Sequence, residues 1–259
     1  MPSPSLIVLT GAGVSAESGL ATFRDADGLW AKVRLEEVAT PEAFARDPSK
    51  VHGFYNARRR ALLDPAVQPN AAHRALAALE AAWPGEFLLV TQNVDNLHER
   101  AGSRRLHHLH GELLKSLCTR CGDIAECRVD LSAATVCATC GRAGGMRPRV
   151  VWFGEMPLEM ETVYRALGGC AIFVSIGTSG TVYPAAGFVE ETRAAGARTI
   201  EVNLDPSASG SRFDEALIGR AGETVPVLVE RLLADQSLSR AKQTDQISEV
   251  FSSPPNPTS

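Results

Sequence analysis

The chain has 259 residues, of which 44% are hydrophobic and 22% are charged, and its formal net charge is −4. This is the composition of a globular protein long enough for one domain with a small insertion, and the acidic balance disfavours nucleic acid and anionic membranes as partners. No apolar run reaches the length of a membrane span and the N-terminus lacks the features of an export signal, so we expect a soluble, cytoplasmic protein. We also expect it to be a monomer.

Apolar runs and helical patterns alternate along the chain. The run LIVLT at 6–10 ends in GAG, which indicates a buried strand followed by a glycine-rich turn. Further buried strands are expected at 86–91, 170–177 and 198–203. Helical periodicity is present at 70–83, after 183–187 and at 225–235. This alternation predicts an α/β fold, a doubly wound parallel sheet of Rossmann type.

Residues 10–19, TGAGVSAESG, could place backbone N–H groups and the start of a helix against a phosphate. The stretch is not the GxGxxG of dehydrogenases, and a plain strand-to-helix turn is an equally good interpretation. The residues directly after it, TFRDADGLW, are typical of a mobile loop over a ligand.

Three consecutive arginines occur in FYNARRR, residues 54–60. If this segment is a helix, Arg58 falls within the apolar stripe that includes Tyr55, whereas Arg60 lies opposite and Arg59 toward the edge. Arg58 and Tyr55 are neighbours at the i, i+3 spacing. On the helix alone, a snorkelling stem or a structural ion pair explains Arg58 more simply than a binding site does.

Residues 112–147 break the alternation and are rich in Cys and Gly. They contain the pattern C-x2-C-x15-C-x2-C, formed by Cys118, Cys121, Cys137 and Cys140. This is the spacing of a four-thiolate structural zinc site, and a site closed by four cysteines leaves no position for substrate. The pattern therefore predicts a small inserted zinc-binding module.

The predicted organisation follows from this insertion. The sheet domain is formed by 1–111, with a small helical insertion around 35–65, and by 148–234. The end of the chain, 235–259, is rich in Ser, Gln and Pro and is predicted to be disordered.

Polar residues follow the strand predicted at 86–91, where open α/β sheets bind ligands. Gln92, Asn93 and Asp95 could hold an amide and ribose hydroxyls. His110, which precedes a glycine, is a candidate general base, although a lone histidine is more often structural.

Taken together, GAGVSAESGLATFRD, TQNVDNLH, HG at 110–111, the two CxxC pairs, VVWFG, GTSGTVYPAA and VNLDPS resemble the sirtuin family in order and spacing. The resemblance spans residues 5 to about 232. It implies NAD as co-substrate, one structural zinc ion, and NAD-dependent removal of acyl groups from lysines of protein substrates. Nicotinamide and 2′-O-acyl-ADP-ribose would be the other products.

The resemblance also implies roles for individual residues. His110, Asn93 and Asp95 match the catalytic residues. The expected NAD contacts are Gly11, Ala12, Gly13, Ser15, Phe23, Arg24, Gln92, Asn93, Asp95, Gly177, Thr178, Ser179, Asn203 and Ala221. Residues of the strand that would pair with the substrate backbone are Val151, Phe153, Gly154 and Glu155.

Tyr55 and Arg58 match the Tyr-x-x-Arg of class III sirtuins, and Ala39 matches a small residue that widens the acyl pocket in that class. A guanidinium and a phenol can bind a terminal carboxylate. We therefore expect removal of succinyl- or malonyl-type groups together with acetyl groups.

Rival interpretations remain open from the sequence. A plain deacetylase would leave Arg58 without a role in acyl recognition, and a sirtuin-like ADP-ribosyltransferase would modify protein with ADP-ribose. A dehydrogenase would need the GxGxxG that is missing here. A zinc-dependent DNA-binding regulator would conflict with the acidic total and the lack of a recognition motif.

Overall fold

The computed structural model describes residues 3–20 and 34–252, with side chains described up to residue 238. Phe23 and Arg24, two of the expected NAD contacts, lie outside the described residues. No helix in the described part of the chain is long and apolar enough to cross a membrane.

The larger of two sheets has six parallel strands in the order β3-β2-β1-β7-β8-β9. Their bounds are β1 Leu6–Thr10, β2 Phe87–Thr91, β3 Leu106–His108, β7 Ile172–Ile176, β8 Arg198–Asn203 and β9 Glu215–Ile218. The strand order reverses between β1 and β7, and ligands of open α/β sheets bind at the carboxyl ends of the strands beside such a switch. The predicted doubly wound α/β fold is confirmed.

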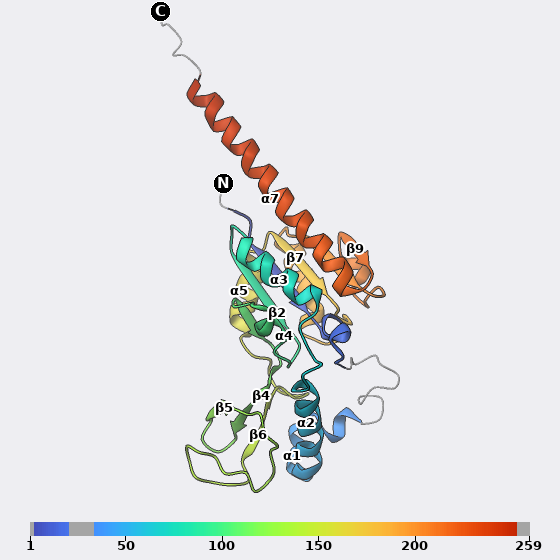
Figure 1. Ribbon diagram of the computed structural model, residues 1–259, viewed down its shortest axis with the longest axis vertical. Helices are drawn as coiled ribbons and strands as arrows, with labels where there is room; N and C mark the ends of the chain where they lie inside the picture. Colours follow the sequence, from blue (N-terminus) through green and yellow to red (C-terminus); the bar gives the residue numbers. More distant parts are fainter. Residues whose placement is uncertain (1–2, 21–33, 253–259) are drawn as a thin grey trace, which may run out of the picture.

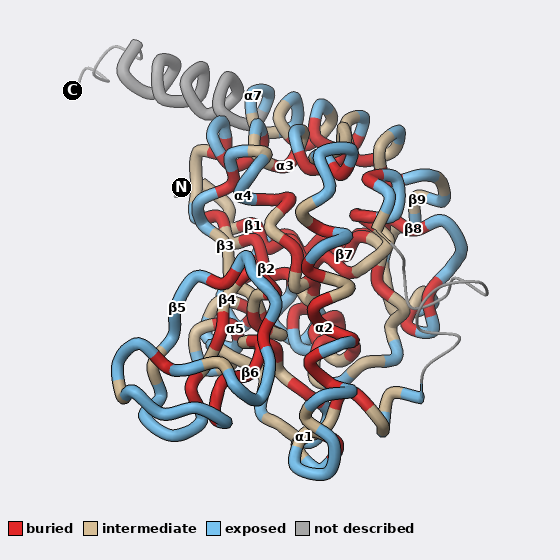
Figure 2. Tube along the Cα trace, turned by 60° about the horizontal axis from the view of Figure 1, so that its bottom comes forward, coloured by how far each residue is buried: buried red, intermediate tan, exposed pale blue. Residues whose placement is uncertain are grey.

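Helices cover both faces of this sheet (Figure 1). The even-numbered side chains Leu6 and Val8 pack with α3 (Ala71–Ala82) and α7 (Ala221–Ser252). The odd-numbered Ile7 and Leu9 pack on the other face with α5 (Met160–Gly168) and α6 (Phe188–Ala194). Because both faces are covered, the central strands are continuous apolar runs, and Figure 2 shows them buried.

The second sheet is smaller and antiparallel, with the order β5-β4-β6. Its strands are β4 Gly111–Cys118, β5 Ile124–Glu126 and β6 Met146–Val150. This sheet lies beside α1 (Pro41–Arg46) and α2 (Pro48–Leu62), away from α3 and α7 (Figure 1).

The start of α2 is set by the sequence DPSK. Pro48 occupies the first helical position, and the Asp47 carboxylate accepts a hydrogen bond of 3.0 Å from the Lys50 backbone N–H. The remaining short helices are α4 Leu97–Ala101 and the 3₁₀ turns Ala12–Val14, Ala16–Ser18, Leu35–Glu37, Ala185–Gly187 and Gly210–Arg212.

The end of the chain differs from the prediction. We expected disorder from residue 235, whereas α7 continues as one helix to Ser252 (Figure 1). Residues 235–252 contain neither Gly nor Pro, the two residues most unfavourable in a helix interior, so the helix can continue there despite the scarcity of large apolar residues.

Candidate functional site

The glycine-rich turns after β1 and β7 are packed against each other at the switch point. The Gly13 N–H donates to the Gly177 carbonyl at 2.9 Å, and a Cβ on Gly11 would lie 2.7 Å from that same oxygen. Gly177 also has φ of +63°, which disfavours any other residue. Gly11, Gly13 and Gly177, three of the expected NAD contacts, therefore form one tight crossing of the backbone at the carboxyl ends of the strands.

Asn93 and Asp95, which follow β2, are joined to the first turn by buried hydrogen bonds. The Asn93 side-chain amide donates to the Gly11 carbonyl and to Ser15 Oγ, each at 3.1 Å. Ser15 Oγ donates to Asp95 Oδ2 at 3.0 Å. Burial raises the pKa of Asp95, and the hydrogen bonds from Leu97 and Ser15 oppose that rise. The structure thus brings Ser15, Asn93 and Asp95 into a single network.

A second group of expected contacts lies at the ends of β7 and β8. The Asn203 amide donates to the Thr178 carbonyl at 2.7 Å, and Ser179 Oγ lies 2.7 Å from Thr181 Oγ1. Ala12 lies in the first 3₁₀ turn and Ala221 opens α7. Within the described part of the chain, Ala221 makes no hydrogen bond to Ser15, Asn93 or Asp95.

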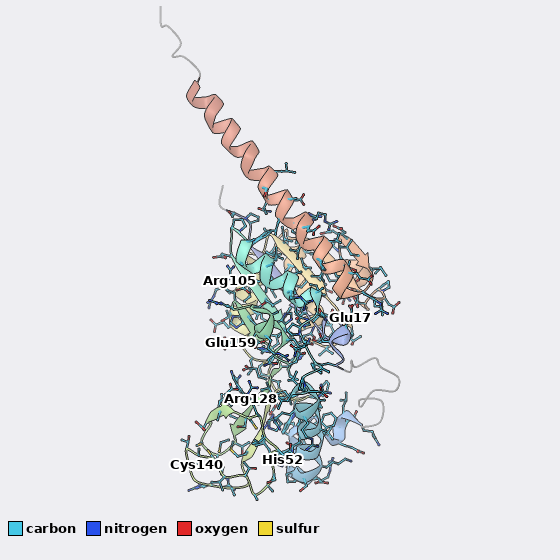
Figure 3. All side chains as sticks on the ribbon, in the orientation of Figure 1. Glu17, His52, Arg105, Arg128, Cys140 and Glu159 are labelled. Carbon is cyan, nitrogen blue, oxygen red and sulfur yellow. The ribbon has the colours of Figure 1, made fainter. Side chains whose placement is uncertain are left out.

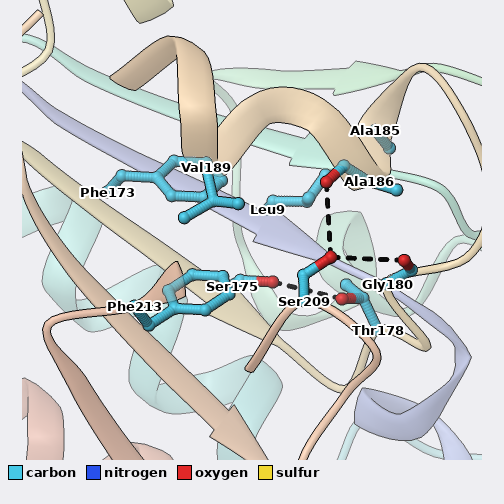
Figure 4. Close-up of a pocket in the computed structure, with 10 residues that line it drawn as sticks. All are labelled: Leu9, Phe173, Ser175, Thr178, Gly180, Ala185, Ala186, Val189, Ser209 and Phe213. Carbon is cyan, nitrogen blue, oxygen red and sulfur yellow. Dashed lines mark hydrogen bonds between the residues drawn. The ribbon is translucent and has the colours of Figure 1, made fainter. Parts of the chain in front are cut away.

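A small cavity underlies the loop at 178–180, and Figure 4 shows its lining. Ser209 Oγ donates to the Gly180 carbonyl at 3.2 Å, and Ser175 Oγ lies 3.2 Å from Thr178 Oγ1. These contacts support the loop from the core side.

His110 lies just before β4, and its tautomer follows from its partner. Nδ1 is 3.0 Å from the Gln92 carbonyl oxygen. Because a carbonyl can only accept, Nδ1 carries the proton and the Nε2 lone pair remains basic. Burial lowers the pKa of His110, with the Gln92 carbonyl opposing, so the ring is neutral near pH 7. His110 therefore has the charge state and tautomer of a general base.

His108, two residues earlier, has a different environment. Nδ1 lies 3.0 Å from the Asn93 carbonyl oxygen and Nε2 lies 2.8 Å from Glu99 Oε1. Both partners are acceptors, so both ring nitrogens carry protons. Burial lowers the pKa of His108, but the ion pair with Glu99 outweighs it and the net pKa is raised. The imidazolium thus supports the backbone of Asn93.

The arginines of α2 correct one prediction. Arg59, expected toward the edge of the apolar stripe, is 1% exposed, whereas Arg58 has intermediate burial and Arg60 is exposed as expected. Arg59 donates to the carbonyls of Leu113 and Val129 and to the side chain of Asn56.

The reason for the buried Arg59 is that α2 packs on two sides. Besides the side that carries Tyr55 and Arg58, it contacts the zinc module, where Asn56 also hydrogen-bonds both backbone groups of Leu131 at 2.8 and 2.9 Å. Sequence reasoning missed this contact because its partners are backbone carbonyls, which leave no sequence signal.

Tyr55 and Arg58 project from the same side of α2. Tyr55 is 3% exposed, and burial raises its pKa to about 12, with the Arg58 charge opposing. Burial also lowers the pKa of Arg58, while Tyr55 and Asp95 oppose this shift. The Arg58 guanidinium therefore lies within electrostatic range of Asp95. Ala39 belongs to the same buried cluster as Tyr55.

The Tyr55 hydroxyl has a partner that the sequence did not predict. The indole nitrogen of Trp152 donates to it at 2.9 Å. Trp152 lies within VVWFGE, but we interpreted that stretch by its backbone and not by its side chains. The indole N–H, the one side-chain donor in the stretch, was the available signal.

The segment 151–155, which is predicted to pair with the substrate backbone, is held in place by hydrogen bonds at both ends. The Val151 N–H donates to the His110 carbonyl and the Phe153 N–H donates to the Ala39 carbonyl, each at 2.9 Å. Gly154 has φ of +90° in the turn that follows. Glu155 closes this turn by accepting from the backbone of Trp152 and from Arg147. The Glu155 carboxylate is thus engaged within the chain.

The four predicted zinc ligands converge on one point of the smaller sheet. Their sulfurs all lie within 4.8 Å of one another, with Cys118–Cys140 at 3.8 Å and Cys121–Cys137 at 3.7 Å. A tetrahedron with Zn–S bonds of about 2.3 Å has S···S edges of about 3.8 Å, so the residues fit a zinc ion. Backbone N–H groups of Arg120 and Cys121 lower the pKa of Cys118 to about 7, whereas the pKa of Cys121, beside the other three thiols, is raised to about 12. Figure 3 shows Cys140 in this lobe, remote from Glu17 and the large sheet.

Comparison with known proteins gives consistent results. The model of the Sir2 family matches residues 11–184. An NAD-dependent protein deacylase of Salmonella typhimurium is 57% identical over 233 residues, covering 90% of this chain and 85% of its own. The NAD-dependent protein deacylase of Escherichia coli K12 is 56% identical, covering 90% and 84%.

Solved structures agree with these matches. A Sir2 homologue in complex with NAD superposes with a TM-score of 0.81 at 42% identity, covering 90% of both chains. Sir2Af2 bound to a myristoylated histone peptide superposes with a TM-score of 0.69 at 33% identity, covering 90% of this chain and 92% of the other.

Proposed function

Because this chain belongs to the Sir2 family, we propose that it is an NAD-dependent protein-lysine deacylase that prefers succinyl- or malonyl-type groups and also removes acetyl groups. Its products are the free lysine, nicotinamide and 2′-O-acyl-ADP-ribose. The relatives at 55–57% identity carry the name NAD-dependent protein deacylase, which supports the general activity. The acyl preference rests on this chain's own residues.

The chain's residues fit NAD as co-substrate. The crossing of the two glycine turns presents backbone at the carboxyl ends of β1 and β7, where a dinucleotide phosphate would lie. Ser15, Asn93 and Asp95 are held beside this crossing by their mutual hydrogen bonds, so their polar groups can hold the ribose and the nicotinamide amide.

His110 would act as the proton acceptor. Its Nδ1 proton is held by the Gln92 carbonyl, so Nε2 can take a proton from a ribose hydroxyl. The ring's lowered pKa keeps it available as a base at neutral pH.

Zinc would be held by the four cysteines. Bound there, the ion supplies a fixed tetrahedral link between the two knuckles, and its four thiolates leave no position for substrate. Its effect on activity is then indirect, through the fold of the module against α2.

The proposed preference for acidic acyl groups rests on Arg58. A guanidinium and a protonated phenol lie side by side on α2, next to the catalytic loop and within an otherwise apolar cluster. A terminal carboxylate would receive charge-assisted hydrogen bonds from Arg58 and a further hydrogen bond from Tyr55. An acetyl group needs neither, so it can still be accommodated.

The test compares kcat/KM of one lysine peptide carrying a succinyl or an acetyl group, with NAD, for the wild type and Arg58→Met. Loss of the charged contacts should lower succinyl activity by roughly 10-fold or more and spare acetyl activity. Arg60→Met is the matched control, because Arg60 is exposed on the same helix and pairs with Asp130. Equal succinyl and acetyl rates that Arg58→Met leaves unchanged would assign Arg58 a structural role and leave a plain deacetylase. ADP-ribose found on the protein instead of on the acyl group would indicate an ADP-ribosyltransferase.

A further inference from the structure

The hydrogen bond between Trp152 and Tyr55 determines the direction of the Tyr55 proton. An indole nitrogen is a donor only, so in this 2.9 Å contact the Tyr55 oxygen must accept. The phenol O–H prefers to lie in the plane of its ring, where it has two orientations. The orientation that faces the indole N–H is excluded, because two donor hydrogens would then meet. It therefore points away from Trp152.

Among the residues that the structure describes, no hydrogen bond donated by the Tyr55 hydroxyl is recorded. The neighbouring Arg58 is a cation that can only donate. Since burial raises the pKa of Tyr55 to about 12, the hydroxyl stays protonated throughout the neutral range. Tyr55 is thus a donor prepared for an anionic acceptor beside Arg58.

Trp152 is itself held firmly in place. It is 2% exposed, and the guanidinium of Arg147 stacks on its ring, with 3.3 Å between Arg147 Cζ and the ring centroid. Both terminal nitrogens of Arg147 bind the Glu155 carboxylate, at 2.6 and 2.9 Å. Phe44 packs against the indole with ring centroids 5.3 Å apart. The indole N–H therefore has a fixed direction.

We propose that Trp152 is a positioning residue for acyl specificity: its indole N–H orients the Tyr55 hydroxyl so that the phenol donates its proton to the carboxylate of an acidic acyl group held by Arg58. The inference deepens the proposed function and rests on it. Trp152 acts through Tyr55, so its contribution requires the Tyr55 hydroxyl to be present.

The pairing is tested first without substrate, by NMR of the protein labelled with ¹⁵N at tryptophan. The chain has three tryptophans, so the indole signals can be assigned by single substitutions to phenylalanine. Tyr55→Phe should shift the Trp152 N–H signal upfield. The Trp83 signal should stay in place, because its indole donates to the Pro4 carbonyl instead. An unmoved Trp152 signal would overturn the proposed hydrogen bond.

The functional role is tested by a double-mutant cycle with the ratio of kcat/KM for succinyl-lysine to that for acetyl-lysine as readout. Trp152→Phe keeps an aromatic ring but removes the donor, and should lower the ratio by roughly 5- to 10-fold, the effect of one hydrogen bond. In the Tyr55→Phe background the same change should leave the ratio as it is. An equal fold-change in both backgrounds would show that Trp152 does not act through Tyr55.

Failure of this inference can be distinguished from failure of the proposed function. An acetyl preference in the wild type, unaltered by Arg58→Met, contradicts the proposed preference. An additive cycle in a wild type that does prefer succinyl contradicts only the role of Trp152. Trp83→Phe serves as the control for loss of an indole hydrogen bond elsewhere, and it should leave the ratio unchanged.

Discussion

Arg59→Met should destabilise the protein strongly, although Arg59 lies between an arginine proposed for specificity and an exposed one. Its guanidinium donates to the Leu113 carbonyl at 3.1 Å, to Asn56 Oδ1 at 2.9 Å and to the Val129 carbonyl at 3.3 Å. The substitution would leave these acceptors without their donor inside the contact between α2 and the zinc module.

The magnitude follows from the number of bonds and the cost of burial. A hydrogen bond from a charged donor contributes about 1.5 to 3 kcal/mol, so three would contribute at least about 4.5 kcal/mol. Burial of the guanidinium, which lowers the pKa of Arg59, opposes this gain. Within the described part of the chain, Nη2 has no hydrogen-bond partner, which reduces the gain further. We expect a net loss of about 3 kcal/mol in the free energy of unfolding.

Urea unfolding followed by circular dichroism measures this loss, and the neighbouring arginine provides the control. Arg60→Met removes only the exposed pair with Asp130, which should cost less than about 1 kcal/mol. If Arg59→Met and Arg60→Met had the same unfolding midpoint, the buried contact would not hold α2 to the module.

Three further predictions concern the metal, the glycine crossing and acid stability. Cys137→Ser removes one of the four zinc ligands, so it should release the zinc and lower the Tm. Atomic absorption measures the bound zinc. A variant that keeps one zinc per chain with an unchanged Tm would contradict the site. Gly177→Ala should abolish the thermal stabilisation of the protein by NAD. The new Cβ would lie 2.6 Å from the Val14 nitrogen, and residue 177 has a φ of +63°. Normal stabilisation by NAD would show that the crossing of the glycine turns tolerates a side chain. Burial lowers the pKa of His73 to about 4, so its contribution to stability is complete above pH 6.5 and is lost as the pH falls toward 4, by up to about 3 kcal/mol. His73→Gln should flatten the dependence of the urea midpoint on pH, and an identical slope in variant and wild type would refute this.

The central strands could be predicted because both of their faces are covered. Such strands are continuous apolar runs, and the run at 6–10 coincides with β1. The short edge strands β3 and β9 were missed, since LHH and EALI are only partly buried and lack that signal. For 235–252 the composition suggested disorder, whereas the structure continues α7 to Ser252, and a segment without Gly or Pro allows such a continuation.

The candidate site was predictable where its residues follow strands of the large sheet. Ser15 and Asn93 come after β1 and β2, and parallel strands bring their carboxyl ends together. The contact of Trp152 with Tyr55 was not predictable in this way, since it joins residues 97 positions apart that lie on no common sheet edge. The helix periodicity placed Arg58 correctly near Tyr55 but misjudged Arg59, because it treated α2 as a helix with one buried side.

One competition experiment tests the central claim most directly. Equal amounts of succinyl- and acetyl-lysine peptides of one sequence are mixed with NAD and the wild-type chain, and mass spectrometry follows both peptides together with nicotinamide and 2′-O-acyl-ADP-ribose. We predict that the succinyl peptide is consumed first, that the acetyl peptide follows, and that one nicotinamide appears for each acyl group removed. Faster loss of the acetyl peptide, or loss of NAD without any deacylated lysine, would contradict the account.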